Sequence, residues 1–214
     1  MPLAFKQSLY DNNEPISHIY FLLNAVGSLI TALPDGSTIE VGTVGNEGII
    51  GLPVFLGVSQ VPGTAICQVP GNAIQMRTEF FRQVVTPDTV LFSLLLRYTQ
   101  ALMYQISRSA ACNQLHCVEE RFCRWILMTH DRVRADQFPL TQEFASQMLG
   151  VRRASVSVAA SVIQKAGLIR YRRGQMTILD RAGLESAACD CYRNIQMEYD
   201  RLIGGNNRPR KKAV

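Results

Sequence analysis

Residues 1–87 alternate between short apolar segments and turn residues. Phe21 to Ala32 and Thr38 to Val44 are rich in Val, Ile, Leu and Thr, and Ile66 to Val69 and Ala73 to Met76 are two further short candidate strands. Gly and Pro recur between these segments. Short strands with such punctuation predict a small antiparallel β-roll or barrel.

A helical pattern follows in residues 88–117, which contain no Gly and no Pro. Side chains suited to a buried seam recur three or four residues apart at Leu91, Leu95, Tyr98, Leu102 and Ile106, with Gln105 as the alternative to Ile106. This spacing is typical of a long helix that packs against a second helix. We expect these five residues to form a dimer interface, and the alternative is a helix that packs only within its own chain.

Residues 118–214 have the pattern of a helical domain with a hairpin, followed by a C-terminal helix and a basic tail. Val118 to Val133 has the apolar spacing of one amphipathic helix. Leu168 to Tyr171 and Met176 to Leu179 flank the basic sequence Arg172-Arg173-Gly174-Gln175, which predicts a β-hairpin with a basic tip.

The segment between this helix and the hairpin matches a helix-turn-helix. Thr141 is a suitable N-cap for a first helix, and Gly150 stands where the turn requires a positive φ. A second helix, over about residues 152–166, would bury Val156 where it crosses the small Ser146. Together with the basic hairpin, this order of elements predicts a winged helix-turn-helix.

Charge is distributed unevenly along the chain. Residues 1–117 carry 5 Lys and Arg against 7 Asp and Glu, and residues 118–214 carry 17 against 10, so the net charge of +5 resides in the second half. A basic half favours a nucleic-acid partner, and the alternative is a solvated basic face. The last basic group, Arg208 to Lys212, is expected to be a disordered tail.

A helix N-terminus and a basic hairpin both suit phosphate groups. An Arg near the start of the second helix can also pair with guanine in the major groove. The predicted phosphate contacts are Thr141, Gln142, Arg152, Ser157, Arg170, Arg172 and Arg173.

Over about residues 16–192 the chain resembles transcription regulators of the cyclic-AMP receptor/fumarate-nitrate regulator (Crp/Fnr) family. The motifs that carry the resemblance are RYTQALMYQISRSAACNQLHCVEERFCRWILMTHDRV, LTQEFASQMLGVRR and AGLIRYRRGQMTILDRAGLE. It implies an α+β fold with a cyclic-nucleotide-binding-like β-roll at 1–87, a dimerisation helix at 88–117 and a winged helix-turn-helix at 118–214. It also implies a cytoplasmic homodimer that binds a palindromic site in double-stranded DNA and contacts RNA polymerase.

The resemblance assigns the base contacts position by position. In the cyclic-AMP receptor the recognition helix opens with Arg-Glu-Thr and carries a second Arg three residues later. Arg153, Ala154, Ser155 and Val158 stand at those positions. We therefore expect Arg153 to read guanine, while Ala154 or Val158 could contact a thymine methyl group, so that the preferred DNA sequence differs.

The positions of the nucleotide site differ from the family pattern. Leu52 and Pro53 replace the Glu and Leu that follow Gly, and Gly63-Thr64 falls near the Arg-Ser pair that holds the cyclic phosphate. No Arg or Lys occurs between Lys6 and Arg77. We expect no binding of cyclic AMP, no resident cofactor and an effector that, if present, is an unknown small molecule. The N-terminus is short for the family, so the roll is either incomplete or a natural short form.

Cysteine and histidine suggest an alternative within the same fold. Cys112, His116 and Cys117 are close enough in sequence to supply metal or redox ligands, although small apolar residues in a helix interface explain them more simply. A thiol- or metal-responsive regulator is therefore the alternative function. A Cys-His enzyme is a distant one, because no catalytic motif occurs, and we expect no catalytic residue. No apolar segment is long enough to predict a membrane span.

Overall fold

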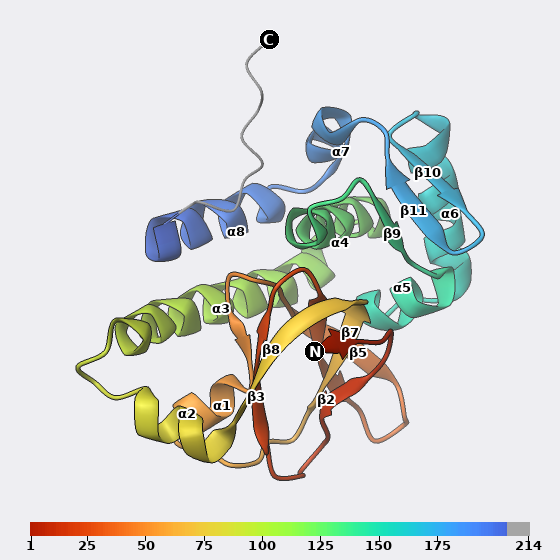
Figure 1. Cartoon of the computed structure of the whole chain (residues 1–214). Coiled ribbons are helices and arrows are strands. Elements are labelled where there is room, and N and C mark those ends of the chain that lie inside the picture. The colour runs from red at the N-terminus through yellow and green to blue at the C-terminus, as the bar shows by residue number, and fades with distance from the viewer. Residues whose placement is uncertain (205–214) are drawn as a thin grey trace.

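Two four-stranded antiparallel sheets form the N-terminal part of the computed structural model, which describes residues 1–204 (Figure 1). One sheet has the order β1-β8-β3-β6 and the other β2-β7-β4-β5. The strands are β1 (Pro2–Leu3), β2 (Ser8–Tyr10), β3 (His18–Leu22), β4 (Val26–Ala32), β5 (Thr38–Val44), β6 (Ile49–Ile50), β7 (Thr64–Val69) and β8 (Gly71–Arg77). The predicted antiparallel roll is confirmed, and β1 and β2 of the short N-terminus each pair with a strand of it.

The prediction of one strand over Phe21 to Ala32 is wrong. β3 ends at Leu22 and β4 begins at Val26, and the two strands belong to different sheets. Between them the Asn24 side chain accepts a hydrogen bond from the Asn72 amide at 2.7 Å. A Cβ on Gly71 would come within 2.5 Å of the Ala25 backbone, so the chain changes sheets at a close backbone contact that only Gly permits.

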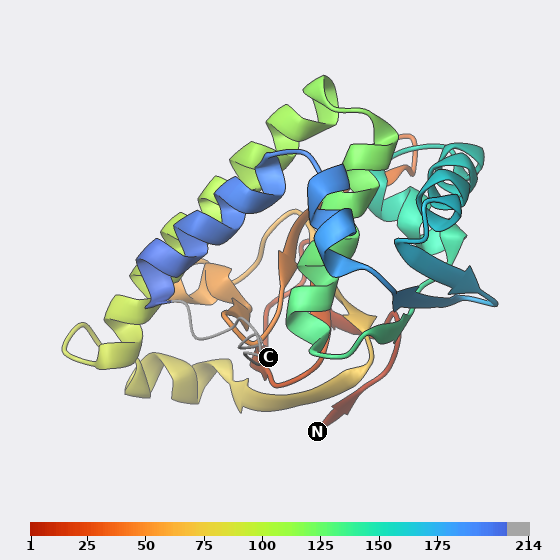
Figure 2. The same cartoon turned by 90° about the horizontal axis from the view of Figure 1, so that it is seen from above.

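The long helix α3 (Val90–Leu115) runs across the roll, as Figures 1 and 2 show. Thr89 is its N-cap and accepts a hydrogen bond from the Phe92 amide at 3.2 Å. Two short helices, α1 (Leu52–Phe55) and α2 (Thr78–Val84), belong to the roll. The predicted helix is thus confirmed to within two residues at its C-terminal end, since it ends at Leu115 instead of Cys117.

The predicted dimer seam of α3 packs inside its own chain. Leu95, Tyr98 and Leu102 are 3%, 2% and 5% exposed and belong to the core of the roll, and Leu91 and Ile106 pack against the same core. Leu95, Tyr98 and Leu102 are therefore covered by their own chain, and a dimer contact through the half-buried Leu91 and Ile106 stays a prediction. The spacing correctly predicts a buried face on α3. It does not identify what covers that face, because packing against the roll and packing against a second helix both require an apolar stripe.

Residues 118–204 form a helical part with a small sheet. Its elements are α4 (Val118–Val133), β9 (Gln137–Pro139), α5 (Gln142–Leu149), α6 (Arg153–Lys165), β10 (Ile169–Arg172), β11 (Gln175–Ile178), α7 (Arg181–Ala187), α8 (Cys191–Tyr199) and the π-helical turn η1 (Asp200–Gly204). The predicted bounds of α4 are those of the structure. Arg208 to Lys212 lie outside the described residues.

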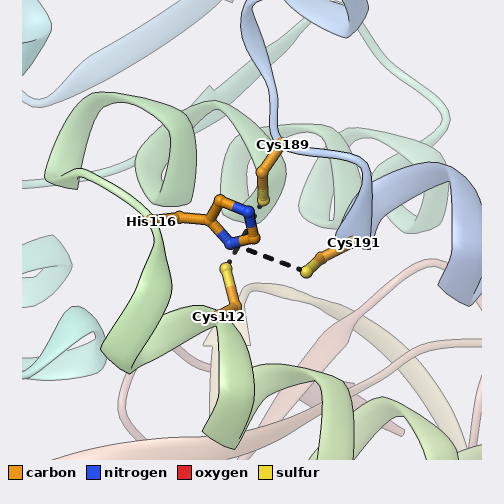
Figure 3. Close-up of side chains that lie close together, drawn as sticks. All are labelled: Cys112, His116, Cys189 and Cys191. Carbon is orange, nitrogen blue, oxygen red and sulfur yellow. Dashed lines mark hydrogen bonds between the residues drawn. The ribbon is translucent and has the colours of Figure 1, made fainter.

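Helix α8 turns back and lies along α3 (Figures 1 and 2). The Tyr199 hydroxyl donates a hydrogen bond to the Gln105 side chain at 3.1 Å near one end of the contact. Near the other end, Cys189 and Cys191 lie beside Cys112 and His116 (Figure 3). The C-terminal helix therefore connects the helix-turn-helix part to the long helix of the roll.

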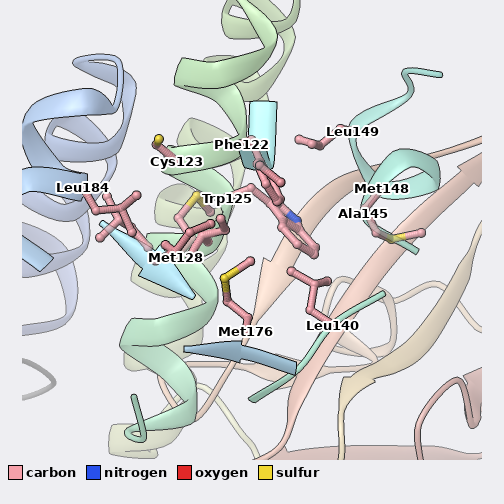
Figure 4. Close-up of a cluster of buried hydrophobic side chains, with 14 of the residues drawn as sticks. Phe122, Cys123, Trp125, Met128, Leu140, Ala145, Met148, Leu149, Met176 and Leu184 are labelled. Atoms are coloured by element: carbon pink, nitrogen blue, oxygen red, sulfur yellow. The ribbon is translucent and has the colours of Figure 1, made fainter. Parts of the chain in front are cut away.

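The core of the C-terminal part gathers around α4, whose residues Phe122, Trp125 and Ile126 are at most 2% exposed (Figure 4). Side chains from α5, α6, the small sheet and α7 complete this core, among them Phe144 and Leu184. The core holds the two helices of the helix-turn-helix and the hairpin in fixed positions. Within the described residues no helix has both the length and the apolar character to cross a membrane.

A polar network joins the roll to α4. The Trp125 indole donates to the Glu40 carboxylate at 2.9 Å, and the hydroxyls of Ser28 and Thr43 donate to the same group. The Gln68 amide donates to Thr129 at 2.8 Å. Burial raises the pKa of Glu40, and the three hydrogen bonds and the nearby Arg124 oppose that rise only in part.

Glu40→Gln is expected to remove a pH-dependent loss of stability. Because the pKa of Glu40 is raised in the folded state, its stabilising contribution is fully present below the unfolded pKa and is lost as pH rises through the folded pKa. Over the pH range from about 4 upward, the wild type should therefore lose stability relative to Glu40→Gln, by about 1.4 kcal/mol per unit of pKa shift. Urea unfolding across that range tests it, with the exposed Glu79→Gln as control. Parallel profiles of wild type and Glu40→Gln would contradict it.

Candidate nucleic-acid interface

The turn between α5 and α6 has the predicted helix-turn-helix geometry. The Thr141 hydroxyl caps α5 by accepting a hydrogen bond from the Phe144 amide at 3.1 Å. Gly150 ends α5 with φ +62°, and a Cβ there would meet Ile39 of β5 at 2.8 Å. A left-handed backbone and close contact with the roll both explain why Gly stands in this turn.

One face of α6 packs inside and the other faces outward. Val156 and Ala159 are fully buried against the core, with Ile163 one turn further on. Arg153, Ala154 and Val158 are exposed, and Val158 is 59% exposed. Ser155 is only half-buried at the edge of this face. The structure thus places the predicted base contacts at the N-terminal, outward part of α6, which begins at Arg153 instead of the expected Arg152.

Two predicted phosphate contacts are paired with each other in the free chain. The Ser157 hydroxyl donates to the Gln142 side-chain oxygen at 2.6 Å and to the Arg153 carbonyl at 3.1 Å. The pair connects α6 to the start of α5 and uses the side-chain oxygen of Gln142. Arg152 is exposed just before α6.

The wing is a two-residue hairpin held against both helices. Arg173 and Gly174 have φ of +51° and +73°, as a type I′ turn requires. The Leu140 amide donates to the Gly174 carbonyl at 2.8 Å, and the Tyr171 amide donates to the Gln164 side chain of α6 at 2.6 Å. The wing tip therefore lies beside the N-terminus of α5.

Three arginines, Arg170, Arg172 and Arg173, are exposed on the wing. Burial raises the pKa of Tyr171 in the wing to about 12, and the charge of Arg153 opposes that rise. Arg153 of α6 is therefore close enough to the wing to act on Tyr171. The exposed arginines of α6 and of the wing thus belong to neighbouring elements. This arrangement can hold an anionic backbone while α6 reaches its base edges.

Part of the excess positive charge is internal and was not anticipated from the sequence. Arg121, Arg124 and Arg132 of α4 are 8%, 4% and 8% exposed. Arg132 pairs with Glu47 of the roll at 2.7 Å, and Arg121 donates to the Leu149 carbonyl at 2.5 Å. The charge of the second half is therefore divided between the DNA-facing surface and the domain interior.

The cysteines are arranged differently from the sequence prediction. Cys112 and His116 lie together, but Cys117 is exposed and does not belong to the group. Cys189 and Cys191 take its place, although they are more than seventy residues away along the chain. Only the return of α8 along α3 brings them there, so no short spacing in the sequence could have revealed them.

Comparison with known proteins agrees with this geometry. Residues 120–187, which include most of α4 and all of α5, α6 and α7, match the Crp-like helix-turn-helix domain. This part of the chain is a Crp-like helix-turn-helix domain. The matched range contains Arg153 and the arginines of the wing, and it ends before Cys189 and Cys191.

Over 88% of its length the chain has the fold of solved CRP/FNR-family transcription regulators. The CRP-family regulator TTHB099 from Thermus thermophilus is 20% identical with a TM-score of 0.72 over 88% of this chain and 96% of that chain. FixK2 from Bradyrhizobium japonicum is 14% identical with a TM-score of 0.70 over 88% and 96%. TTHA1359, a CRP/FNR-family regulator that also comes from Thermus thermophilus, is 15% identical with a TM-score of 0.69 over 88% and 97%. No curated protein sequence matches significantly.

The family match thus identifies the helix-turn-helix part, and the likeness to solved structures shows the fold of the chain that contains it. The predicted α+β order of roll, long helix and winged helix-turn-helix is confirmed. The boundaries at residues 87 and 117 stay predictions.

Proposed function

We propose that the protein is a homodimeric, sequence-specific transcription regulator that inserts α6 into the major groove of a palindromic DNA site. The observation that carries this proposal is the outward face of α6 with Arg153 beside a wing of three exposed arginines. As the family resemblance implies, it would act in the cytoplasm and contact RNA polymerase. The CRP/FNR fold favours this function over the Cys-His enzyme that the cysteines left open.

In this arrangement one group of side chains contacts the bases and another contacts the phosphates. Arg153 pairs with guanine, Ala154 and Val158 contact methyl groups, and Ser155 is short enough for close approach of the helix. The predicted phosphate contacts position the domain without reading sequence. Because these contacts displace counterions, affinity should fall steeply with salt.

A second copy of the chain would pack on the outward face of α3. The buried seam faces the roll, but a second row with four-three spacing is exposed on the same helix. That row consists of Leu96, Gln100, Met103, Ser107, Ala110 and Gln114. Leu96 and Met103 are 52% and 59% exposed, and no member of the row is charged. Such a row is what a two-helix seam requires, and its small residues allow close packing.

The roll does not favour cyclic AMP as effector. Leu52, at the position of the family's ribose-binding Glu, is 8% exposed and part of the roll core. Arg132 reaches the roll from α4, but its charge is already paired with Glu47. A cyclic phosphate near Thr64 would therefore lack a compensating cation from the roll's own strands. An unknown small molecule remains open as effector.

Selection from a random double-stranded DNA library, followed by sequencing, tests the proposal. We expect a two-fold symmetric sequence whose half-sites are about 10 base pairs apart, one helical turn. Met103→Lys should abolish the dimer in sedimentation experiments and weaken binding to the full site at least tenfold. Leu33→Lys, 53% exposed in a turn of the roll, is the matched control and should change neither. Failure to enrich any sequence would refute the function, and an unaffected Met103→Lys dimer would refute the interface.

A further inference from the structure

The molecule has a cluster of soft metal ligands away from the DNA-binding surface. Cys112 and His116 come from the end of α3, Cys189 from the α7–α8 connection and Cys191 from the first turn of α8. Figure 3 shows the four side chains converging. The three cysteines are buried, at no more than 5% exposure, and form a small separate core group.

The distances in the cluster fit one tetrahedral ion. The four ligand atoms lie within 4.8 Å of one another. The Cys112 and Cys189 sulfurs are 3.4 Å apart, and the Cys191 sulfur is 3.8 Å from Nδ1 of His116. Zinc–sulfur bonds of about 2.3 Å in a tetrahedron place neighbouring sulfurs about 3.8 Å apart. A small shift of side chains would therefore complete the coordination.

The surroundings carry positive charge that a thiolate-bound ion would balance. Arg124 lies close enough to Cys112 to interact with its charge, and Arg121 interacts with both Cys112 and Cys189. Both arginines are more than nine-tenths buried, and the Nε atom of each has no hydrogen-bond partner among the described residues. Three thiolates with one Zn²⁺ carry a net charge of −1, which such buried cations stabilise.

We propose that Cys112, His116, Cys189 and Cys191 bind one zinc ion in a closed Cys3His site that fastens α8 to the end of α3. Four protein ligands leave no open position, which is the pattern of a structural site. Binding deprotonates the three thiols and releases their protons to solvent. Zinc uses all four side chains, whereas a Cys112–Cys189 disulfide would leave Cys191 and His116 without a role.

The site changes the metal hypothesis that the sequence suggested. Cys117, next to His116 in sequence, is exposed and lies outside the group. The ion would connect the region after the Crp-like domain to the long helix, across more than seventy residues of chain. Its role is thus to hold the C-terminal helix in place, and it does not depend on the DNA-binding proposal.

Metal analysis of the full chain, purified without chelators, tests the site. We expect one zinc per chain by mass spectrometry, and less than a tenth of that in Cys189→Ser and His116→Ala. Cys117→Ser is the matched control, because it removes a neighbouring thiol outside the cluster, and it should keep full zinc. Chelation should lower the thermal midpoint of the wild type by roughly 5–10 °C.

Cobalt exchange tests the coordination without any variant. The wild-type chain loaded with Co²⁺ should show sulfur-to-metal charge transfer and the strong visible bands of tetrahedral coordination. A wild type that binds neither Zn²⁺ nor Co²⁺ would overturn the site, as would a mapped Cys112–Cys189 disulfide in metal-free protein. Full zinc in folded Cys189→Ser would also overturn it. Each of these results is read on the free protein and leaves the DNA-binding function to its own test.

Discussion

Glu47→Ala is expected to lower the free energy of unfolding by about 3–5 kcal/mol, because it leaves a buried arginine without its counter-charge. One carboxylate oxygen of Glu47 accepts from Nε and Nη2 of Arg132 at 2.8 and 2.7 Å. Both side chains are only 9% exposed, so water would compensate the lost carboxylate only in part. Arg132 keeps its bonds to the Met128 carbonyl and the Gln105 side chain, but neither carries a negative charge.

Urea unfolding followed by circular dichroism measures this effect. The exposed pair of Glu79 and Arg77, whose side chains are 67% and 68% exposed, supplies the control, and Glu79→Ala should change stability by less than about 1 kcal/mol. In the double variant Glu47→Leu with Arg132→Met, apolar groups replace both charges, so it should lose less than Glu47→Ala alone. Equal losses of unfolding free energy in Glu47→Ala and Glu79→Ala would show that the buried pair stabilises the fold no more than the exposed pair does.

The sequence predicted the helices and strands better than it predicted what packs against each of their faces. The spacing of Leu95, Tyr98 and Leu102 identified a buried stripe on α3, but periodicity does not say whether a roll or a second chain covers it. Both demand the same apolar side chains, and only the three-dimensional path of the chain distinguishes them. The outward row through Leu96 and Met103 was missed because its polar and small members do not produce a hydrophobic pattern.

Local rules succeeded where the structure depends on local geometry. Thr141 as an N-cap and Gly150 in the turn follow from hydrogen bonding and backbone conformation within a few residues. The break between β3 and β4 was not visible, because it depends on contact with Gly71, far along the chain. The partners of Cys112 and the buried role of Arg132 were hidden for the same reason, since each depends on elements that meet only in the folded chain.

Arg153→Ala is expected to reduce specific DNA affinity of the dimer by roughly 30-fold to 10⁴-fold. A bidentate arginine–guanine pair contributes about 1–3 kcal/mol, and a palindrome uses the residue twice, so independent half-sites give about 2–6 kcal/mol. Because Arg153 is exposed, stability of the fold should change by no more than about 0.5 kcal/mol. Fluorescence anisotropy with the selected site and with random DNA, at several salt concentrations, measures both kinds of binding.

Arg170→Ala supplies the comparison that distinguishes base recognition from phosphate contact. Arg170 is an exposed wing arginine predicted to contact phosphate, so its loss should weaken specific and random DNA alike and lower the salt slope by about one per chain. Arg153→Ala should instead spare most random-DNA affinity and relax the base preference at one position of each half-site. If both variants weaken both DNAs equally, Arg153 is a phosphate contact, and recognition would then have to come from Ala154, Ser155 and Val158.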